Sequence, residues 1–482
     1  MSFNSLEFAV FLPVVFAMYW FGCGGRVRRQ NVLIVVASYA FYGWWDWRFL
    51  GLIALSTAID FAVGRALTGE RRPGRRRGLL GVSLAANLGM LGLFKYFDWF
   101  VASFAEAFTL FGQPAAAWTL GVVLPVGISF YTFQTLSYTI DVYRGRLAAA
   151  DDPVAFAAFV SFFPQLVAGP IERATHLLPQ FSRRRRFAYA AGVDGLRQVL
   201  WGLFKKVVVA DNCASYVDVF FADPEAFGGS ALALGAVFFA VQIYGDFSGY
   251  SDIAIGTARL FDVDLRRNFA YPYFSRDIAE FWRRWHISLS SWFKDYLYIP
   301  LGGSRGSRAL RVRNTFAVFL VSGLWHGANW TFVVWGVVHA ALFLPLLLAD
   351  ANRRHLDLVG GGGLLPSARE AAHMLATFAL VTVAWVFFRA RDLGHAVDYL
   401  AGMASASLLS VPQFGGRPLA LAVALACAFC FALEWAGRRA EHPLAAVALA
   451  WPRPARLALY LGLATAVLLN AGQRQTFIYF QF

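Results

Sequence analysis

The chain has little charge for its size: only 15% of its 482 residues are Asp, Glu, Lys or Arg. Hydrophobic residues make up 58%, and the mean hydropathy is +0.52, which is too apolar for a soluble globular protein. The apolar runs also lack the alternation of barrel strands, so they fit helices that satisfy their own backbone groups. The sequence therefore predicts an all-α, polytopic membrane protein with about ten or eleven transmembrane helices plus re-entrant and surface helices.

Cysteine is scarce, and its four positions suggest no disulfide framework. Cys427 and Cys430 lie three residues apart in an apolar run, so we interpret them as buried small residues on one helix face rather than a redox or zinc pair. Gly-x-Ser-x-Gly elbows, metal-spaced His/Cys clusters, Walker loops and internal repeats are also missing from the sequence. Any chemistry must therefore rest on few groups.

Acidic residues are fewer than basic ones, and the formal net charge is +14. The Lys and Arg residues fall in short blocks between apolar runs, at 26–29, 71–77, 183–186 and 305–313. This is the pattern of cytoplasmic loops, which we favour over nucleic-acid binding. It predicts an external N-terminus. If successive helices cross the membrane in strict alternation, Arg389 and Arg391 fall on the external side, which conflicts with the same pattern. The N-terminal apolar segment has neither a basic n-region nor a cleavage site, so we expect it to be retained.

Polar residues interrupt the apolar run at 231–261. The segment YGDFSGYSDIAIG places Asp246, Ser248 and Tyr250 beside glycines, which is typical of a broken helix whose freed backbone groups need water or a ligand. We predict that these three side chains bind substrate, and a simple extramembrane turn is the alternative. Lys205 and Lys206 lie inside an apolar stretch that we expect near the surface, where both side chains can snorkel.

His286 is one of two histidines that stand among tryptophans in the segment 271–329. A histidine at membrane depth is costly without a cavity or a partner, so each is a candidate site residue. Ser275 can cap a helix beginning near Arg276. That helix would carry one apolar stripe, formed by Trp282, His286, Leu289 and Phe293. A structural histidine that donates to a backbone carbonyl fits this position as well as a functional one.

His326 has the stronger case for catalysis. The segment SGLWHGANW ends a long apolar run with Gly327, which lets the backbone turn or another group approach closely. An imidazole held out of bulk water can stay neutral and accept a proton from a hydroxyl, as a general base does. We predict Trp325 and Asn329 as substrate contacts, and a purely structural His326 is the alternative. His339 would point elsewhere on an unbroken helix, so it is not expected in the same site.

A glycine-rich loop, LGGSRGSR at 301–308, follows the first histidine. Its backbone amides, with Arg305 and Arg308, could bind the phosphates of a donor. A flexible loop with no ligand is an equally good interpretation. The basic cytoplasmic loops would also attract an anionic donor or anionic lipid headgroups.

Several long segments carry a resemblance to a known family. They are spread over nearly the whole chain: FYTFQTLSYTIDVYRG, SFFPQLVAGPIER, YGDFSGYSDIAIG, FWRRWHISLSSWFKDYLYIPLGG, SGLWHGANWTFVVWGVVHA and FIYFQF. These segments resemble the membrane-bound O-acyltransferase (MBOAT) family, and within it the alginate O-acetylase branch. The pattern is less specific to substrate, because acetylases of cellulose and peptidoglycan and the D-alanyl transferase of teichoic acids share much of it.

The resemblance implies one MBOAT membrane domain over residues 1–482, with a cytoplasmic and a periplasmic funnel. The family's invariant histidine matches His326 and its second histidine matches His286, which implies catalytic roles for both. The implied reaction is O-acetyl transfer from cytoplasmic acetyl-CoA, or a carrier-bound acetyl thioester, across the bacterial inner membrane to an exopolysaccharide, with alginate the first choice. No bound cofactor or metal is implied. The implied partners are periplasmic acetyltransferases, the polysaccharide and the bilayer, with no nucleic acid.

Two other classes fit parts of the pattern. A polysaccharide or lipid-carrier transporter would also have polar residues and broken helices within its spans. A catalytically silent scaffold of a secretion complex is a third interpretation. A scaffold would not need polar groups gathered around two intramembrane histidines, so we place it last.

Overall fold

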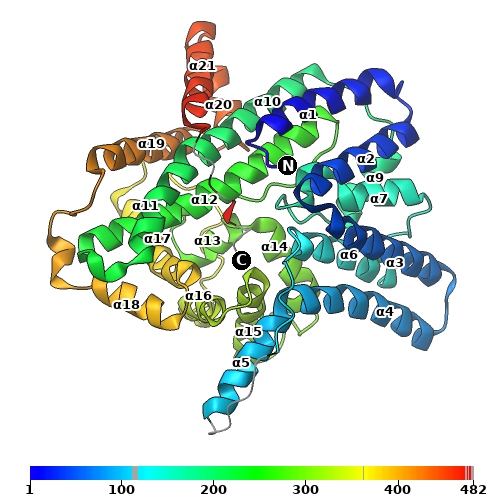
Figure 1. The fold of residues 1–482 in the computed structure, drawn as a ribbon, viewed down its shortest axis with the longest axis horizontal. Helices are drawn as coiled ribbons and strands as arrows, with labels where there is room; N and C mark the ends of the chain where they lie inside the picture. The colour runs from blue at the N-terminus through cyan, green and yellow to red at the C-terminus, as the bar shows by residue number, and fades with distance from the viewer. Residues whose placement is uncertain (111–117, 362, 473–474, 476, 479–482) are drawn as a thin grey trace. The chain divides into compact units, whose positions relative to one another are not determined.

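The computed structural model describes residues 1–110, 118–361, 363–472, 475 and 477–478 (Figure 1). Helices and the turns between them make up this part of the chain, and no strand occurs in it. The predicted all-α class is confirmed. Contacts divide the chain into two compact units, one of Met1–Gly195 with Thr257–Arg266 and one of Leu196–Gly256 with Arg267–Phe482. Two of the three boundaries fall inside helices, α10 (Tyr189–Leu203) and α12 (Gly229–Leu260), and the third lies in the loop after α12.

The first unit contains both short and long helices. They are α1 (Leu6–Ala17), η1 (Met18–Gly22), α2 (Val27–Asp46), η2 (Trp47–Phe49), α3 (Leu50–Gly69), α4 (Pro73–Leu91), η3 (Gly92–Tyr96), α5 (Phe97–Leu110), α6 (Ile128–Tyr143), α7 (Pro153–Ser161), α8 (Phe163–Leu166) and α9 (Ala174–Ser182).

Helices α3, α4 and α6 pack side by side around a buried carboxylate (Figure 1). Asp60 of α3 accepts hydrogen bonds from Asn87 Nδ2 at 2.8 Å, Thr139 Oγ1 at 2.9 Å and the Ser83 hydroxyl. A hydroxyl of α6 thus serves helix packing.

The interrupted apolar segment after α6 forms two short buried helices, α7 and α8, separated at Phe162 and followed by a loop. Pro164 lies in the first turn of α8, where its missing N–H costs least. This agrees with a segment too short to span a membrane.

The second unit holds the remaining helices. They are η4 (Phe204–Ala210), α11 (Asp211–Ala222), η5 (Pro224–Ala226), η6 (Pro272–Phe274), α13 (Ile278–Arg284), α14 (Ile287–Phe293), η7 (Lys294–Tyr298), α15 (Arg308–His326), α16 (Trp330–Leu348), α17 (Ala368–Arg389), α18 (Leu393–Met403), η8 (Ala406–Leu409), α19 (Arg417–Ala436), α20 (Pro443–Ala450) and α21 (Arg453–Asn470).

The predicted break in α12 is wrong, because the helix runs without interruption for 32 residues. Its polar side chains find partners on other segments. The Asp246 carboxylate pairs with Lys206 Nζ at 2.7 Å and accepts from the backbone N–H of Ile478 at 2.8 Å. Ser248 Oγ accepts from Lys205 Nζ at 2.8 Å. The side chains of Asp246 and Ser248 thus have partners on other segments, and the backbone of α12 keeps its own helical hydrogen bonds instead of bonding to water or a ligand.

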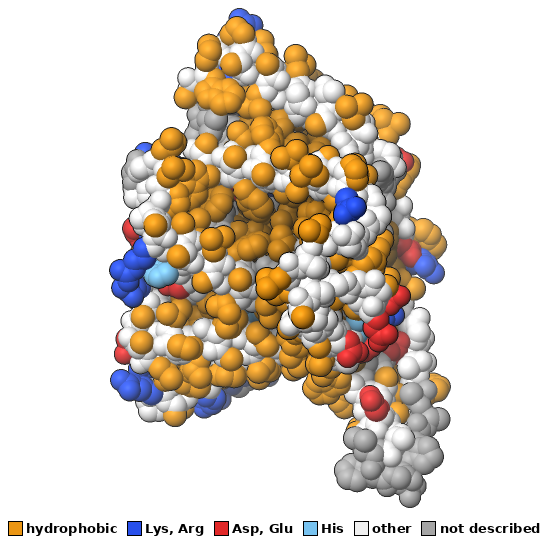
Figure 2. Space-filling view, turned by 90° about the vertical axis from the view of Figure 1, so that its left-hand side faces the viewer, with side chains coloured by type: hydrophobic (Ala, Val, Ile, Leu, Met, Phe, Trp, Pro, Cys, Tyr) orange, Lys and Arg blue, Asp and Glu red, His pale blue; other side chains and the backbone are white. Residues whose placement is uncertain are grey.

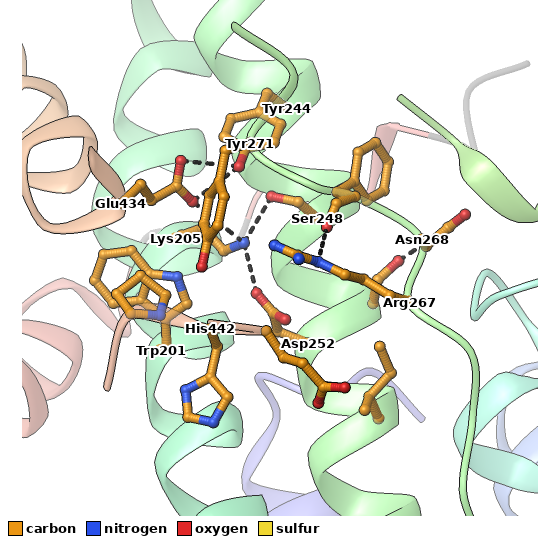
Figure 3. Close-up of a pocket in the computed structure, with 15 residues that line it drawn as sticks. Trp201, Lys205, Tyr244, Ser248, Asp252, Arg267, Asn268, Tyr271, Glu434 and His442 are labelled. Atoms are coloured by element: carbon orange, nitrogen blue, oxygen red, sulfur yellow. Dashed lines mark hydrogen bonds and ion pairs between the residues drawn. The ribbon is translucent and has the colours of Figure 1, made fainter. Parts of the chain in front are cut away.

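The expectation that Lys205 and Lys206 snorkel is also wrong. Their residues are only 2% and 7% exposed. Lys205 Nζ lies 2.6 Å from Asp252 and 3.8 Å from Glu434 beside a small cavity (Figure 3). Lys206 Nζ lies 2.8 Å from Asp211. Carboxylates within reach make pairing inside the unit possible, and buried charges in proteins are paired in this way.

Six helical stretches in the described residues are long and apolar enough to cross a membrane. They are Val27–Gly69, Pro73–Thr109, Gly229–Leu260, Trp330–Leu348, Ala368–Arg389 and Arg417–Ala436. The first two each contain two long helices, and Leu6–Gly22 is a shorter apolar helix. Figure 2 shows a face on which hydrophobic side chains predominate and charged ones gather towards the edges. On α19, for example, Leu421 and Leu425 are each 62% exposed, as expected for side chains that face lipid.

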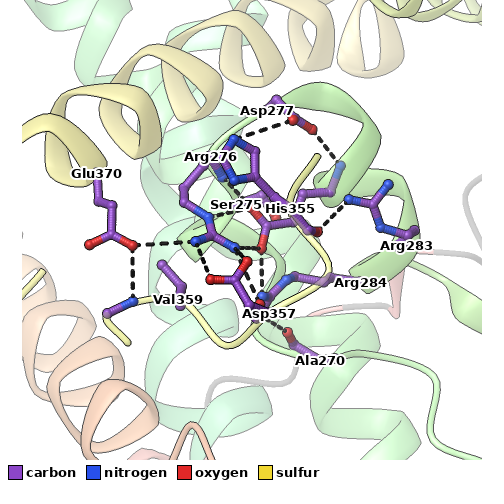
Figure 4. A network of polar contacts seen from close by, with 12 residues as sticks. Ala270, Ser275, Arg276, Asp277, Arg283, Arg284, His355, Asp357, Val359 and Glu370 are labelled. Atoms are coloured by element: carbon purple, nitrogen blue, oxygen red, sulfur yellow. Dashed lines mark hydrogen bonds and ion pairs between the residues drawn. The ribbon is translucent and has the colours of Figure 1, made fainter. Parts of the chain in front are cut away.

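A buried arginine ties the segment between α16 and α17 to α13 (Figure 4). Arg276 contacts Glu280 at 3.0 Å, Asp357 at 2.9 Å and Glu370 at 3.3 Å. Arg284 also contacts Glu280, at 2.6 Å, one helical turn further along α13. Breaking a buried pair such as Arg276–Glu280 costs about 3–5 kcal/mol, so this pair holds the start of α13 in place.

Candidate active site

His286 lies at a break between two short helices. The predicted single helix with an apolar stripe is wrong: α13 ends at Arg284, and α14 begins at Ile287. Asp277, not Ser275, caps α13 and accepts from Glu280 N, while Ser275 Oγ donates to the carbonyl of Pro272.

The backbone of His286 is left-handed, with φ +43°. Histidine is one of the few residues besides glycine enriched at positive φ, yet the conformation is strained by about 1–3 kcal/mol and persists only where the surroundings fix it. Such strain is concentrated at functional sites, so this observation favours the functional interpretation of His286.

The ring of His286 is fully buried among aromatic side chains. Its centroid lies 4.7 Å from Phe247 and 5.6 Å from Trp325, and its Nδ1 lies 3.1 Å from Asn268 Oδ1. His286 lies outside the candidate spans, and burial lowers the pKa of its ring to about 3. The ring is therefore neutral at neutral pH, and its unprotonated nitrogen can accept a hydrogen bond.

His326 is the last residue of α15, as the sequence predicts. The residue is 4% exposed, and its ring packs edge-on against Trp335 at 5.2 Å and Phe388 at 5.2 Å. Gly327 follows in extended backbone, and a Cβ there would overlap the ring of Phe332. Glycine is thus required at this turn for close packing rather than for a positive φ.

The two histidine rings lie close together, with centroids 6.4 Å apart. Trp325 packs against both, at 5.6 Å from His286 and 4.9 Å from His326. A hydroxyl that reached both imidazoles could give its proton to an unprotonated ring and be oriented by the other. The structure brings together the two residues that the sequence singles out.

His339 is nearer to this pair than an unbroken helix would place it. The chain turns between α15 and α16, and the indole of Trp335 lies between His326 and His339, 5.2 Å and 4.8 Å from their centroids. Trp282 Nε1 donates to His339 Nδ1 at 3.2 Å. His339 therefore belongs to the aromatic shell behind His326.

The other predicted contacts divide into two sets. Asp246 and Ser248 are buried in the lysine network described above, and Tyr250 packs at 4.9 Å from Phe477. Trp325 lies between the two histidines. Residues 479–482, the end of the FIYFQF segment, lie outside the described residues.

Asn329 and the two loop arginines lie away from the rings. Asn329 caps α16 by accepting from Thr331 N at 3.0 Å, and it donates to the carbonyl of Arg391 at 2.8 Å. Arg305 and Arg308 are exposed, in a loop with positive φ at Gly302, Gly303 and Gly306. Whether these residues bind substrate stays a prediction.

Sequence reasoning did not predict that Asn268, Trp335 and Phe388 are neighbours of the two histidines. Asn268 lies between the polar segment of α12 and α13 and is fully buried. Its partner His286 comes 18 residues later, a spacing that matches no helical or strand period. Among the described residues, no group of three or more His, Cys, Asp or Glu side chains is placed to hold a metal ion.

Comparisons with known proteins identify the family. Residues 150–360, which contain both histidines, match the model of the membrane-bound O-acyltransferase family. The chain is 41% identical over 413 residues to a protein of Azotobacter vinelandii named probable alginate O-acetylase AlgI, covering 84% of this chain and 78% of that protein. It is 39% identical over 504 aligned residues to the protein of the same name from Pseudomonas putida, covering 100% of both. It is 36% identical over 423 residues to the peptidoglycan O-acetyltransferase of Helicobacter pylori, covering 82% and 77%. The chain therefore belongs to the membrane-bound O-acyltransferase family: it is a multi-pass membrane protein and an O-acyltransferase.

Proposed function

We propose that this enzyme passes an acetyl group from a cytoplasmic thioester across the bacterial inner membrane for O-acetylation of an exopolysaccharide, alginate being the first choice. The observation that carries the proposal is the buried pair His286 and His326, with ring centroids 6.4 Å apart. Relatives named alginate O-acetylase, similar over most of the chain, support the acetyl group and the polymer.

The proposed reaction is acyl transfer between sulfur and oxygen. His326 takes the proton of an acceptor hydroxyl, either on a partner's serine or on the sugar, and the oxygen attacks the thioester carbonyl. The new C–O bond forms, the C–S bond breaks, and the proton passes to the leaving thiolate, so an ester and a thiol result. A general base of this kind contributes about 10²- to 10⁴-fold in rate. His286 positions or polarises the reacting groups.

The distribution of basic residues supports a cytoplasmic side for the donor and a periplasmic side for the acceptor. Basic blocks at 71–77 and 305–313 fit a cytoplasmic face that attracts an anionic donor, acetyl-CoA or a carrier-bound acetyl thioester. The N-terminus is then periplasmic, and the acceptors are the polysaccharide and periplasmic acetyltransferase partners. Arg305 and Arg308 are the proposed donor contacts. Asp246, Ser248, Tyr250, Trp325 and Asn329 are the proposed contacts along the substrate path.

Peptidoglycan is the second candidate polymer. The similarity to the Helicobacter pylori peptidoglycan O-acetyltransferase, 36% identity over 82% of this chain, is nearly as high as that to the alginate relatives. Polymer analysis in the cell decides between the two, because the O-acetyl groups would be found on different sugars.

The experiment that tests the function is acetyl transfer by His326→Ala. Acetyl transfer is measured with full-length protein reconstituted in vesicles with radiolabelled acetyl-CoA, and acetylated polymer is measured in cells. In both measurements His326→Ala should reduce transfer by about 10²-fold or more. His373→Ala, which changes a partly exposed histidine of α17, is the matched control and should retain full activity. Normal acetylation by an inserted His326→Ala protein would refute the assignment. Movement of polymer with no consumption of thioester would instead indicate a transporter.

A further inference from the structure

We propose that Asn268 is a positioning residue that holds His286 in the tautomer with its proton on Nδ1, which leaves the lone pair on Nε2. What that lone pair does rests on the proposed function, whereas the tautomer itself follows from hydrogen-bond geometry. Asn268 is 0% exposed and precedes α13 in the loop after α12.

The orientation of the Asn268 amide is fixed by a group that can only donate. The backbone N–H of Ser288 lies 3.3 Å from Asn268 Oδ1, and a peptide N–H requires an acceptor. The Ser288 hydroxyl donates to the same oxygen at 2.9 Å. On the other side, Asn268 Nδ2 donates to Ser251 Oγ of α12 at 3.2 Å. The atom that faces Ser288 and His286 is therefore the amide oxygen.

The tautomer of His286 follows from that oxygen. His286 Nδ1 lies 3.1 Å from Asn268 Oδ1, and an amide oxygen has no hydrogen to give. Nδ1 must therefore carry the proton, and in a neutral imidazole the other nitrogen then holds the lone pair. His286 can accept a hydrogen bond or a proton at Nε2, but in its neutral form it cannot donate there.

The left-handed backbone of His286 makes this contact possible. The N–H of the next residue, Ile287, donates to the backbone carbonyl of Asn268 at 2.9 Å. Asn268 thus holds His286 by the ring, Ile287 by its N–H and Ser288 by its N–H and hydroxyl. A helical backbone at residue 286 would carry the ring away from these partners. The strained left-handed backbone is therefore needed for the contact that sets the tautomer.

His339 provides an internal contrast. The indole N–H of Trp282 donates to His339 Nδ1, so a neutral His339 carries its proton on Nε2. The two histidines are therefore held in opposite tautomers by partners of opposite kind. Of these two histidines, only His286 can accept a hydrogen bond at Nε2. Because a lone pair cannot donate to a carbonyl oxygen, His286 is better suited to position a hydroxyl or thiol than to polarise a carbonyl.

The tautomer can be read directly by nitrogen NMR. We would label the full-length protein with ¹⁵N-histidine, place it in nanodiscs, and assign the His286 and His339 signals with His286→Gln and His339→Gln. In the wild type, His286 should show a protonated Nδ1 and an unprotonated Nε2, and His339 the reverse. Asn268→Leu should lose this preference and slow acetyl transfer by about 10- to 100-fold, less than the loss of a full general base.

Two further variants separate positioning from folding. Asn268→Asp keeps an acceptor oxygen and should keep the tautomer, while Ser251→Ala removes only the contact on the far side of the amide and should keep both tautomer and rate. A wild-type His286 protonated on Nε2, or a tautomer unchanged in Asn268→Leu, would overturn the proposal. If Asn268→Leu does not fold, the wild-type and Asn268→Asp spectra still decide. The proposed role of His286 in acetyl transfer fails separately, if the tautomer is as stated but His286→Gln transfers acetyl normally. The proposed function itself fails if His326→Ala transfers acetyl normally.

Discussion

The surroundings of the histidines in this protein differ, and they affect protonation of the rings in opposite directions. His286 and His326 lie among aromatic rings, whereas His176 of α9 lies between two carboxylates. His176 Nε2 is 3.2 Å from Asp264 and Nδ1 is 2.9 Å from Glu172. These hydrogen bonds, that to Asp264 first, raise the pKa of His176 to about 9, and the contact with His176 lowers the pKa of Asp264. Aromatic burial thus favours a neutral base, and carboxylates favour a cation.

We predict that His176 makes the stability of the fold depend on pH. Its pKa is about 9 in the folded protein and near 6.5 when unfolded, so the folded state binds more protons between these values. The stabilisation is complete below about pH 6.5 and is lost as the pH rises through about 9. His176→Gln should therefore lower the Tm in detergent more at pH 6 than at pH 10. An equal loss at both values, or a larger loss at pH 10, would contradict this.

At the scale of elements, the hairpin of α15 and α16 positions His326. The helices approach closely at two glycines: a Cβ at Gly323 would overlap the carbonyl oxygen of Phe332, and one at Gly336 would overlap that of Phe319. Both contacts are to backbone, which cannot move aside as a side chain can. The close approach leaves the end of α15, and with it His326, little freedom to shift.

We predict that Gly323→Ala or Gly336→Ala separates the two helices and displaces His326. Overpacking of this kind costs about 1–3 kcal/mol, so the Tm should fall and acetyl transfer should fall with it. Gly462→Ala in α21 is the matched control, because a Cβ there meets nothing within 4 Å. Alanine at that position should leave activity unchanged and stability equal or slightly higher. Normal stability of both hairpin variants would show that the helices do not pack as described.

At the scale of the whole molecule, the positive-inside pattern predicts which loops face the cytoplasm. Ser304 lies in the basic loop before α15. Ala404 lies between α18 and α19, on the external side that the sequence predicts when α15, α16 and α17 each cross the membrane. The four native cysteines are all buried, so an introduced cysteine can be labelled against a low background. We expect Ala404→Cys to react with an impermeant maleimide in cells whose outer membrane is permeabilised. Ser304→Cys should react only once the inner membrane is opened, and the reverse result would invert the topology.

Much of the fold could be predicted because its signals are local. Long apolar runs, basic blocks and the glycine after His326 each act within a few residues, and they lead to a helical membrane protein with a histidine at the end of α15. The site could be predicted only in part. The stripe containing His286 fits a helix, yet contacts with Asn268 override that pattern and place the residue in a left-handed turn.

The sequence by itself determined the class of the protein, because a chain this apolar, without the alternation of barrel strands, satisfies its backbone groups in lipid by forming helices. It also determined the family, through long segments that include both histidines. Only the tertiary structure decided how polar groups are paired: Lys205 with Asp252, Asp246 with the backbone of Ile478, and His286 with Asn268. The physical reason is distance along the chain. A buried polar group takes whatever partner the fold brings within about 3 Å, and no periodic pattern marks a partner that lies far away in sequence.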